Sequence, residues 1–434
     1  MAGKPFSEGV FGYIYYINYQ RIEAMSMNLE QAKEKLNKYG QLRVLDHYDT
    51  LTDEQKEMLL KQIDETDFSV IRYAKNPHGN QKRGKIEPLG AMEISEIEKN
   101  EQHFREVGLA ALRARKIGAV LLAGGMGTRL GSDDPKCMYD IGITKPVYIM
   151  QRLIENLMDV VREAGVYVPL FIMTSDKNHE KTVSFMEKMD YFGYDKSVVF
   201  FFKQDMAPAV DYNGKVYMET NYRIATSPNG NGGWFLSMMN SGVLDRAKEL
   251  GIEWLNIFAV DNVLQRISDP CFVGATLDSG CSTGAKVVRK VTPDEKVGAL
   301  CLEDGRPSIV EYYDMTPELL EAKNEKGENA YNFGVILNYL FREKDLERIV
   351  NDELPVHVVE KKIPYIDKDG NEVKPEEPNG YKFEQLAVDL VRELDTCLPY
   401  EVLREKEFAP IKNPTGIDSV ESARELCRLN GIEL

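Results

Sequence analysis

The chain has 434 residues with 54 basic and 70 acidic side chains, which gives a formal net charge of −16. Because one domain usually takes ~100–200 residues, this length indicates two or three domains, or one large α/β core with additions. A hydrophobic fraction of 43% is enough for a sizeable core and excludes a wholly disordered chain. The acidic balance argues against general nucleic-acid binding and against docking on an anionic membrane, since both require dense positive charge. It does not exclude a small basic pocket for a phosphorylated ligand.

Cysteine content and hydropathy indicate a cytoplasmic protein. The six cysteines include no CxxC pair, and so few in a long chain do not form a disulfide scaffold. No run reaches the ~18 apolar residues that a membrane-spanning helix needs. The tyrosine-rich stretch from Val10 to Tyr19 leads into charged residues rather than a small-residue cleavage site. We therefore expect no signal peptide.

Residues 1–115 are predicted to form a helical amino-terminal region with a structural role. Asn28 can cap the helix LEQAKEKLNKYG, which ends at Gly40. Thr52 opens TDEQ, a capping box for the helix that continues through KEMLLKQIDE. The polar stretch 76–85 is typical of a loop, and SEIEKNEQHFREVGLAALRAR returns to a helical pattern.

Over residues 116–415, short apolar runs alternate with helical stretches, which predicts a doubly wound and mainly parallel sheet. The expected strands are IGAVLLA (117–123), VPLFIMTS (168–175), SVVFFFK (197–203), EWLNIFAV (253–260) and GAKVVRK (284–290). Helices are expected in VYIMQRLIENLMDVVREAG and in GWFLSMMNSGVLDRAKELG. Hairpin turns are expected at Asn213-Gly214 and at Asp304-Gly305.

The last part of the chain is predicted to contain a loop and two helices. KDGNEVKPEEPNG is polar throughout, and KFEQLAVDLVREL has a helical pattern. A short helix is expected after Asp418, within residues 416–434. The overall fold class is therefore α/β, with a Rossmann-like mixed sheet preceded by the helical amino-terminal region.

The most informative segment is LLAGGMGTRLGSDDPKCMYDIG, residues 121–142, which we call the glycine loop. It follows the first predicted strand, and ligands of open α/β sheets bind beyond the carboxyl ends of strands. Its first glycines, Gly124 and Gly125, let backbone amides approach a phosphate or a base closely. Arg129 and Lys136 add positive charge at the same place.

The spacing of the glycine loop excludes two common nucleotide motifs. In GxGxxG the last glycine would fall on Leu130, so the dinucleotide fingerprint fails. No GxxxxGK[ST] aligns either, so the loop is not a Walker A motif. A glycine-rich turn alone is often structural, whereas GG-x-GTRLG followed by PK is far more specific.

The glycine loop resembles the signature loop of the eukaryotic-type UDP-sugar pyrophosphorylases, and it is most similar to that of the UDP-N-acetylhexosamine pyrophosphorylases. The related UDP-glucose pyrophosphorylases usually carry TTMG where this chain has TRLG. The resemblance continues in order over nearly the whole chain, through FFKQDMAPAV, SPNGNGGWF, NIFAVDNVL, GAKVVRKVTPDEKVGALC, IVEYYDM, YNFGVI, YKFEQLAVDL and FAPIKN.

This resemblance implies a uridylyltransferase with a GT-A-like nucleotidyltransferase fold and Mg²⁺ as cofactor. The reaction would join UTP to a sugar 1-phosphate and would release UDP-sugar and pyrophosphate. Among the sugar 1-phosphates, the resemblance favours N-acetylglucosamine 1-phosphate. UDP-glucose or UDP-galactose pyrophosphorylase activity of the same family is the alternative. Family members commonly carry an additional carboxyl-terminal domain, and few residues follow Lys412, so no full domain of that kind is expected.

The resemblance also implies roles for particular residues. The catalytic candidates are Arg129, Lys136 and Lys412. The nucleotide-binding candidates are Gly124, Gly125, Gln204 and Gly230. The sugar-binding candidates are Asn231, Gly298, Glu311 and Asn332. Asp261 is the candidate metal ligand, and Lys382 in NGYKFE is a further candidate for the site.

The residue types suit these roles. The Gln204 amide offers a donor and an acceptor, as a pyrimidine edge requires. One carboxylate together with substrate phosphates is a usual way to hold Mg²⁺, which suits Asp261. A mobile ammonium such as Lys412 can neutralise charge that develops in the transition state. Without the resemblance, Asp261 could equally cap a helix, and Glu311 could be an ordinary hairpin charge.

Other functions fit the sequence less well. Gly280-Cys281-Ser282-Thr283-Gly284 fits GxSxG, and His357 follows it in the chain order of an α/β-hydrolase. That elbow needs a strand directly before it, whereas SDPCFVGATLDSG predicts a helix and loop. The histidines form no HExxH or Cys/His set, so structural zinc is not expected. A catalytically inactive binding protein would be expected to lack the charged candidates.

Two residues depart from the family pattern. Cys137 follows the lysine of the glycine loop, and Trp234 follows the Gly-Gly of the second glycine-rich segment. Neither change removes a catalytic group. Either could alter the width of the pocket.

Overall fold

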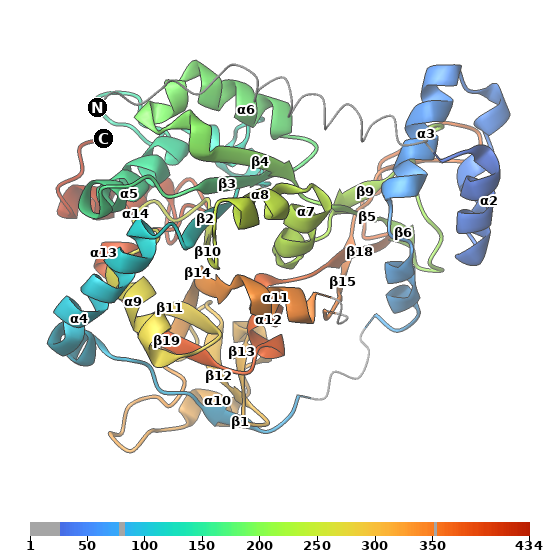
Figure 1. The fold of residues 1–434 in the computed structure, drawn as a ribbon. Coiled ribbons are helices and arrows are strands. Elements are labelled where there is room, and N and C mark those ends of the chain that lie inside the picture. The colour runs from blue at the N-terminus through green and yellow to red at the C-terminus, as the bar shows by residue number, and fades with distance from the viewer. Residues whose placement is uncertain (1–26, 78–82, 351–353) are drawn as a thin grey trace. The chain divides into compact units, whose positions relative to one another are not determined.

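The structure is a computed structural model that describes residues 27–77, 83–350 and 354–434. The expectations for the first residues of the chain, the stretch Val10 to Tyr19 included, lie outside the described residues. The chain divides into two compact units, each made of separate segments (Figure 1). Unit 1 contains Met1–Asn80, Met206–Ser227 and Val356–Glu384, and unit 2 contains Gln81–Asp205, Pro228–Pro355 and Gln385–Leu434.

Unit 1 begins with helices whose caps are those expected from the sequence. Asn28 caps α2 (Leu29–Lys38) and Thr52 caps α3 (Asp53–Glu65), each in a capping box. Short 3₁₀ helices follow, namely η1 (Leu42–Leu45), η2 (Tyr48–Thr50) and η3 (Ser69–Lys75). Leu36, Leu59 and Phe68 of this part are fully buried and pack with residues of the other two segments of the unit.

The other segments of unit 1 supply short strands. One sheet has the order β15 (His357–Lys361), β18 (Gly380–Glu384) and β6 (Val210–Asp211). Two-stranded pairs are β5 (Met206–Pro208) with β9 (Thr226–Pro228), β7 (Met218–Thr220) with β8 (Arg223–Ile224), and β16 (Tyr365–Ile366) with β17 (Glu372–Val373). The turn expected at Asn213-Gly214 is confirmed, with Gly214 at φ +73°. The expected polar loop KDGNEVKPEEPNG contains β17.

Unit 2 is built on one sheet of ten strands. Its main path is β1 (Ile86–Pro88), β12 (Ala299–Glu303), β14 (Phe333–Arg342), β10 (Trp254–Ala259), β2 (Ile117–Leu122), β3 (Leu170–Thr174) and β4 (Val199–Lys203). β11 (Thr283–Arg289) pairs with β14 and β19 (Cys397–Glu401), and β13 (Arg306–Val310) pairs with β12. The strands β10, β2, β3 and β4 are parallel neighbours. The expected α/β fold with a mainly parallel central sheet is confirmed.

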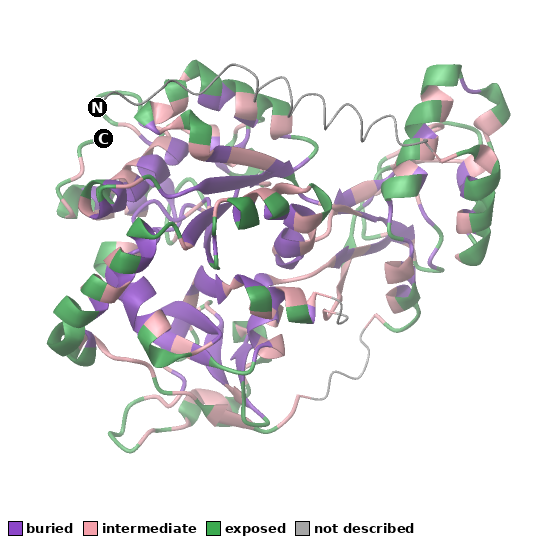
Figure 2. Ribbon diagram, in the orientation of Figure 1, coloured by how far each residue is buried: buried purple, intermediate pink, exposed green. Residues whose placement is uncertain are grey.

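Apolar runs became central strands because both faces of the sheet are covered. Along β2, Ala119 and Leu121 belong to one core, whereas Val120 and Leu122 belong to another on the opposite face. Figure 2 shows the central strands largely in the colour of buried residues. A strand buried on both faces has no polar side, which explains the continuous apolar sequence.

Helices of unit 2 cover this sheet. They are α4 (Ile94–Arg113), α5 (Ile149–Ala164), α6 (His179–Lys188), α7 (Trp234–Asn240), α8 (Val243–Glu249), α9 (Pro270–Ser279), α10 (Pro317–Glu321), α11 (Glu343–Ile349), α12 (Ala387–Glu393), α13 (Arg404–Glu407) and α14 (Val420–Leu429). The 3₁₀ helices are η4 (Thr128–Leu130), η5 (Lys136–Met138), η6 (Asp190–Gly193), η7 (Lys196–Val198), η8 (Asn231–Gly233) and η9 (Tyr312–Asp314). The helix expected after Asp418 is α14.

Two expected helices differ from the observed ones. The stretch GWFLSMMNSGVLDRAKELG forms α7 and α8, because Gly242 between them is left-handed at φ +76°. In KFEQLAVDLVREL the first residues belong to β18, and the helix begins only at Ala387. The hairpin expected at Asp304-Gly305 is confirmed, since it joins β12 to β13.

The helix α4 packs closely on α9 within unit 2. A Cβ on Gly108 would lie 1.9 Å from the Pro270 carbonyl oxygen, and one on Gly274 would lie 1.7 Å from that of Phe104. The glycines therefore allow the two backbones to touch. The division into domains at 1–115, 116–415 and 416–434 stays a prediction. Within the described ranges, no helix is long and apolar enough to cross a membrane.

Candidate functional site

The parallel strands of unit 2 bring several candidate residues to one edge of the sheet. β2, β3, β4 and β10 run in the same direction, so their carboxyl ends share an edge. Gly124 follows β2, Gln204 follows β4 and Asp261 follows β10. Residues far apart in the sequence are therefore neighbours at the mouth of the glycine loop.

The glycine loop is folded back on itself by main-chain contacts. The Lys136 N–H donates to the Gly125 carbonyl over 3.1 Å, and the Gly127 N–H donates to the Asp134 carbonyl over 2.8 Å. A Cβ on Gly125 would meet no described atom within 4 Å, so its backbone is open to a ligand. Arg129 lies on η4 and is exposed.

The side chain of Asn178, a residue that sequence reasoning missed, is hydrogen-bonded to the start of this loop. Asn178 is fully buried, and its Nδ2 donates to the carbonyls of Ala123 (2.8 Å) and Gly125 (3.3 Å). Its Oδ1 accepts from the Ser175 N–H at 2.8 Å, just beyond β3. An amide that bridges neighbouring strand ends fixes the start of the loop. The only signal in the sequence was an asparagine shortly after a predicted strand.

Two candidates form an ion pair at this edge. The Lys136 Nζ lies 3.5 Å from Oδ2 of Asp261, and their side chains are only 16% and 22% exposed. The structure therefore joins the candidate phosphate-binding lysine to the candidate metal ligand, across 125 positions of sequence.

The second glycine-rich segment, PNGNGG, holds the Gln204 side chain. The Gln204 Nε2 donates to the Gly230 carbonyl and, over 3.3 Å, to Oδ1 of Asn229. Its Oε1 points to the glycine loop, at 3.0 Å from the position of a Cβ on Gly124. The amide is therefore oriented, with its donor group bonded to protein and its acceptor oxygen toward Gly124.

Gly230 and Asn231 lie against the segment before α12. Gly230 has φ +87°, and a Cβ there would lie 2.2 Å from the Gln385 carbonyl oxygen. The Asn231 Oδ1 accepts from the Ala387 N–H over 2.9 Å, so this acceptor already has a protein partner. Any contact from Asn231 to a sugar would use its Nδ2.

A pocket of about 260 Å³ gathers candidates from all parts of unit 2. Among its lining residues are Asn231, Asp261, Gly298, Glu311 and Lys412. The Glu311 carboxylate lies beside Gly298, since its Oε1 is 3.3 Å from the position of a Cβ on that glycine. Asn332 does not line this pocket, and its carbonyl accepts from the Lys290 N–H. Lys382 belongs to β18 of unit 1.

The segment that carries Lys412 runs along the end of β10. The Ile411 N–H donates to the Asp261 carbonyl over 2.9 Å, and Asn262 pairs with Pro410 in a β-bridge. The Asn262 side chain donates to the Glu407 carbonyl (2.7 Å) and accepts from the Ala409 N–H (2.9 Å). Asn262 thus holds residues 407–411 at the end of the strand through hydrogen bonds, a role that sequence reasoning missed.

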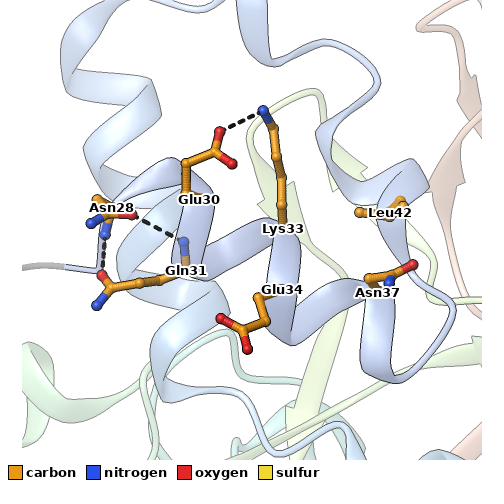
Figure 3. Close-up of a pocket in the computed structure, with 7 residues that line it drawn as sticks. All are labelled: Asn28, Glu30, Gln31, Lys33, Glu34, Asn37 and Leu42. Atoms are coloured by element: carbon orange, nitrogen blue, oxygen red, sulfur yellow. Dashed lines mark hydrogen bonds and ion pairs between the residues drawn. The ribbon is translucent and has the colours of Figure 1, made fainter.

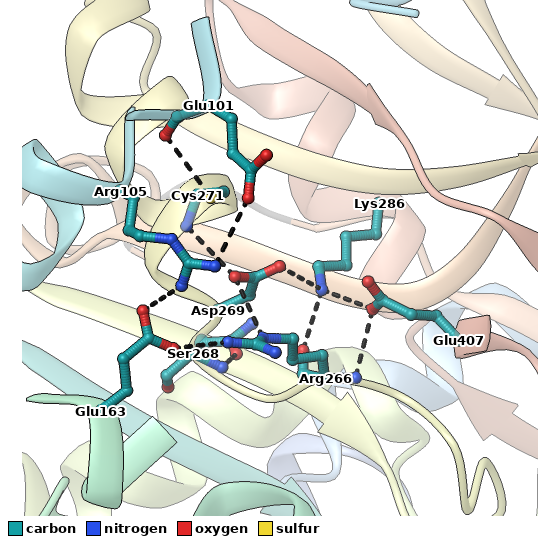
Figure 4. A network of polar contacts seen from close by, with 10 residues as sticks. Glu101, Arg105, Glu163, Arg266, Ser268, Asp269, Cys271, Lys286 and Glu407 are labelled. Atoms are coloured by element: carbon teal, nitrogen blue, oxygen red, sulfur yellow. Dashed lines mark hydrogen bonds and ion pairs between the residues drawn. The ribbon is translucent and has the colours of Figure 1, made fainter. Parts of the chain in front are cut away.

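A polar network around one buried lysine supports the same segment (Figure 4). The ammonium of Lys286, which is fully buried, contacts the Glu407 carboxylate at 2.5 Å and the Arg266 carbonyl at 2.9 Å. The Arg266 guanidinium reaches Glu163 at 2.7 Å and Asp269 at 3.2 Å. Burial raises the pKa of the Glu407 carboxyl, and the nearby Lys286 charge opposes that rise. A lysine within the apolar run GAKVVRK was the sequence signal for this network.

The residues that depart from the family pattern lie in the core. Cys137 and Trp234 are 1% and 0% exposed, and neither lines the pocket. Burial raises the pKa of the Cys137 thiol to about 12. They fill the interior and do not set the width of the pocket directly.

The GxSxG segment is not a nucleophile elbow. The helix α9 precedes Ser282 and the strand β11 follows it, which is the reverse of the strand–turn–helix order. The Ser282 N–H donates to Oγ1 of Thr396 over 2.9 Å. The hydrolase alternative therefore has no structural support.

Unit 1 has a hollow of another kind, which lies along α2 and reaches Leu42 (Figure 3). Its polar contacts are the capping box of Asn28 with Gln31 and a 2.9 Å ion pair between Glu30 and Lys33. These contacts serve the helix itself, and none of the candidate residues lines the hollow.

The chain resembles proteins of one family over most of its length. The family model described as UTP–glucose-1-phosphate uridylyltransferase matches residues 68–430. The human UDP-N-acetylhexosamine pyrophosphorylase-like protein 1 is 33% identical over 421 residues, which cover 91% of this chain and 83% of that protein. The UDP-N-acetylglucosamine diphosphorylase 2 of Arabidopsis thaliana is 34% identical over 420 residues, with coverage of 91% and 82%.

Solved structures agree with the fold. The crystal structure of the uridine diphosphate N-acetylglucosamine pyrophosphorylase from Trypanosoma brucei matches with a TM-score of 0.78. The match covers 93% of this chain and 85% of the other, at 24% sequence identity. The arrangement of strands and helices is therefore shared even where most side chains differ.

Proposed function

Because the chain belongs to the UTP–glucose-1-phosphate uridylyltransferase family and is thereby a nucleotidyltransferase, we propose that it joins UTP to N-acetylglucosamine 1-phosphate. The products are UDP-N-acetylglucosamine and pyrophosphate. The observation that carries this proposal is the pocket of unit 2, where Asp261, Lys412 and Glu311 converge and where Lys136 of the glycine loop lies 3.5 Å from Asp261. A phosphate-binding loop, cations and a carboxylate at one strand edge are the groups that this transfer requires.

The nucleotide is proposed to lie along Gly124 and Gly125, with its base near Gln204 and Gly230. The orientation of the Gln204 amide supports this assignment. Its Nε2 is bonded to Gly230, so its Oε1 is left to accept from the N3–H of uracil. The open backbone at Gly125 leaves space for the nucleotide to pass.

The transfer itself needs charge neutralisation. An oxygen of the sugar phosphate attacks the α-phosphorus of UTP, a new P–O bond forms, and the bond to the pyrophosphate leaving group breaks. We assign Arg129, Lys136 and Lys412 to the phosphates, where fixed positive charge stabilises the transition state more than the ground state. Lys136 and Lys412 are on segments bonded to neighbouring strand ends, which supports a common target.

Nucleotidyltransferases generally use a divalent metal, and we propose Mg²⁺ with Asp261 as its protein ligand. Mg²⁺ is commonly held by one or two carboxylates, substrate phosphates and water, so a lone carboxylate at the pocket fits. The described residues hold no cluster of three or more His, Cys, Asp or Glu side chains suited to a metal. Asp261 would hold the ion, which would supply positive charge to neutralise the phosphates.

The sugar is proposed to bind near Gly298 and Glu311, with Asn231 and Asn332 as further contacts. Carboxylate and amide groups suit hydroxyl and acetamido groups of a hexosamine. Asn332 does not line the pocket and would reach the sugar from outside its lining. Glucose 1-phosphate and galactose 1-phosphate are the alternative substrates. All six cysteines are free, which supports the proposed cytoplasmic location.

The test is pyrophosphate release from UTP with N-acetylglucosamine, glucose and galactose 1-phosphates in turn. We expect the largest kcat/KM with the N-acetylated sugar, and loss of release when a chelator removes divalent metal. A Lys136→Ala preparation purified in parallel controls for contaminating enzymes. No release from any sugar phosphate with Mg²⁺ present would refute the activity. A preference for glucose 1-phosphate would refute only the sugar.

A further inference from the structure

The ammonium of Lys412 has a side-chain partner that no family motif marked. Its Nζ lies 2.9 Å from Oδ2 of Asp418, and the two side chains are 41% and 30% exposed. Among the described residues, Asp418 is the only side chain bonded to this ammonium. Lys412 itself lines the pocket with Asp261.

The loop between these residues is held closed by its backbone. The N–H groups of Lys412 and Asn413 both donate to the Asp418 carbonyl, over 2.6 and 3.0 Å. Asp418 has φ +52°, a left-handed conformation that aspartate tolerates better than most residues. The ion pair therefore joins the two ends of a loop whose shape does not depend on the side chains alone.

The far end of this loop is fixed by α14. Ser419 caps the helix through a 3.1 Å bond from the Ser422 N–H, and its hydroxyl donates to the Gly416 carbonyl over 2.7 Å. The Val420 N–H donates back to the Asn413 carbonyl. Asp418 is thus presented by a rigid support, unlike the partners of most surface ion pairs.

We propose that Asp418 is a positioning residue that holds the Lys412 ammonium toward the phosphates of the substrate. This inference rests on the role proposed above for Lys412. An ammonium has three N–H donors, so one can stay on Asp418 while the others bind phosphate oxygens. A lysine side chain free to rotate would lose more entropy on binding and would present its charge less often.

An alternative is a surface ion pair that serves stability alone. Exposed lysine–carboxylate pairs usually contribute little to stability, and their removal does not change chemistry elsewhere. The two hypotheses differ in whether replacing Asp418 changes kcat when Lys412 has already been replaced. Double-mutant analysis separates them.

The experiment compares Asp418→Asn, Lys412→Ala and the double variant with the unchanged full chain. Asparagine keeps the size and the left-handed tolerance of aspartate and removes its charge. We expect Asp418→Asn to lower kcat about 10-fold, to change KM for UTP by less than about 3-fold, and to have no further effect in the Lys412→Ala background. Uridylyl transfer is measured as pyrophosphate release, and folding is checked by thermal unfolding.

The matched control is Glu253→Gln, which breaks a lysine–carboxylate pair of similar length. Glu253 lies 3.0 Å from Lys116 at the amino ends of β10 and β2, the opposite edge from the pocket. We expect its kcat to stay unchanged. If Asp418→Asn fails to fold, Asp418→Gly is used, because glycine accepts the same backbone conformation.

The outcomes separate the inference from the function beneath it. Multiplicative losses in the double variant, or an unchanged kcat in Asp418→Asn, would overturn the positioning role. A fully active Lys412→Ala variant would overturn the role proposed for the lysine itself. Loss of activity in Lys412→Ala that Asp418→Asn does not deepen supports both.

Discussion

At the residue scale, Gly230 must be glycine for two reasons, its backbone conformation and its close packing. Its φ of +87° is strained for any side chain, and a Cβ would also lie 2.2 Å from the Gln385 carbonyl oxygen. The same residue accepts the hydrogen bond that orients Gln204. A change at this position therefore affects both stability and the proposed contact to uracil.

We predict that Gly230→Ala weakens UTP binding about 10-fold or more and destabilises the fold. Gly251→Ala is the matched control, because Gly251 has φ +85° but no described atom within 4 Å of its Cβ position. Both variants carry backbone strain from a positive φ, so an excess loss in Gly230→Ala reflects its extended ψ of 163° together with the contact with Gln385. Urea unfolding and calorimetry with UTP measure the two effects. Equal behaviour of the variants would contradict the prediction.

Single residues also show where sequence reasoning stops. The capping boxes at Asn28 and Thr52 were predictable because all their partners lie within three positions. The pairing of Lys136 with Asp261 joins residues 125 positions apart, and no local pattern specifies it. In the sequence, Asp418 resembles any other loop aspartate. Its contact with Lys412 depends on its own left-handed backbone conformation, which no local pattern predicts.

At the element scale, α14 connects two segments of the candidate site. Ser419 at its amino end is hydrogen-bonded to the loop that follows Lys412, and Arg424 is hydrogen-bonded to the end of the glycine loop. The Nε and Nη2 of Arg424 donate to the carbonyls of Ile141 and Gly142, each over 2.9 Å. The helix predicted only as a short terminal element thus supports both lysine-bearing segments.

We predict that Arg424→Gln lowers the free energy of unfolding by about 1–3 kcal/mol, because two charge-assisted hydrogen bonds are lost. We also expect kcat to fall, since Lys136 lies on the segment that Arg424 holds. Arg428→Gln is the matched control on the same helix, where the arginine is 69% exposed and pairs with Glu425. A similar loss in both variants would mean that Arg424 serves the helix alone. Urea unfolding and pyrophosphate release are the measurements.

The observed helices and strands differ from the predicted ones where contacts with distant segments determine the backbone conformation. The parallel strands were recognisable because two cores bury both of their faces, as in β2. The break between α7 and α8 depends on Gly242 in a left-handed conformation, which a helical pattern does not reveal. The first residues of KFEQLAVDLVREL pair with β15 and are drawn into a strand, although their sequence favours a helix.

At the scale of the whole molecule, the compact units are not continuous stretches of sequence. Unit 1 is assembled from three segments, and α4 packs in unit 2 although it precedes the parallel strands β2, β3, β4 and β10. Hydropathy patterns could identify the segments but not this interleaving, because they carry no information on which distant segments share a core. The net charge of −16 likewise did not reveal a local cluster of Lys136 and Lys412.

We predict that a chain of residues 116–434 alone does not fold to a stable monomer. It would lack α4 and expose the face of α9 where Gly274 now contacts the Phe104 carbonyl. It would also lack Leu36, Leu59 and Phe68, which fill the core of unit 1. Size-exclusion chromatography and binding of a hydrophobic dye, compared with the full chain, provide the measurements. A monomeric, cooperatively unfolding product would instead support the division at residues 115 and 116.

The position of α14 has a consequence for reading genetic variants of this protein. A premature stop codon between Asn413 and Ser419 would leave every candidate residue, from Gly124 to Lys412, in the translated product. It would nevertheless remove the bonds that Ser419 and Arg424 supply to the two lysine-bearing segments. Such an allele is therefore expected to behave as a loss of function, and a classification that counts only substrate-contacting positions would score it as harmless.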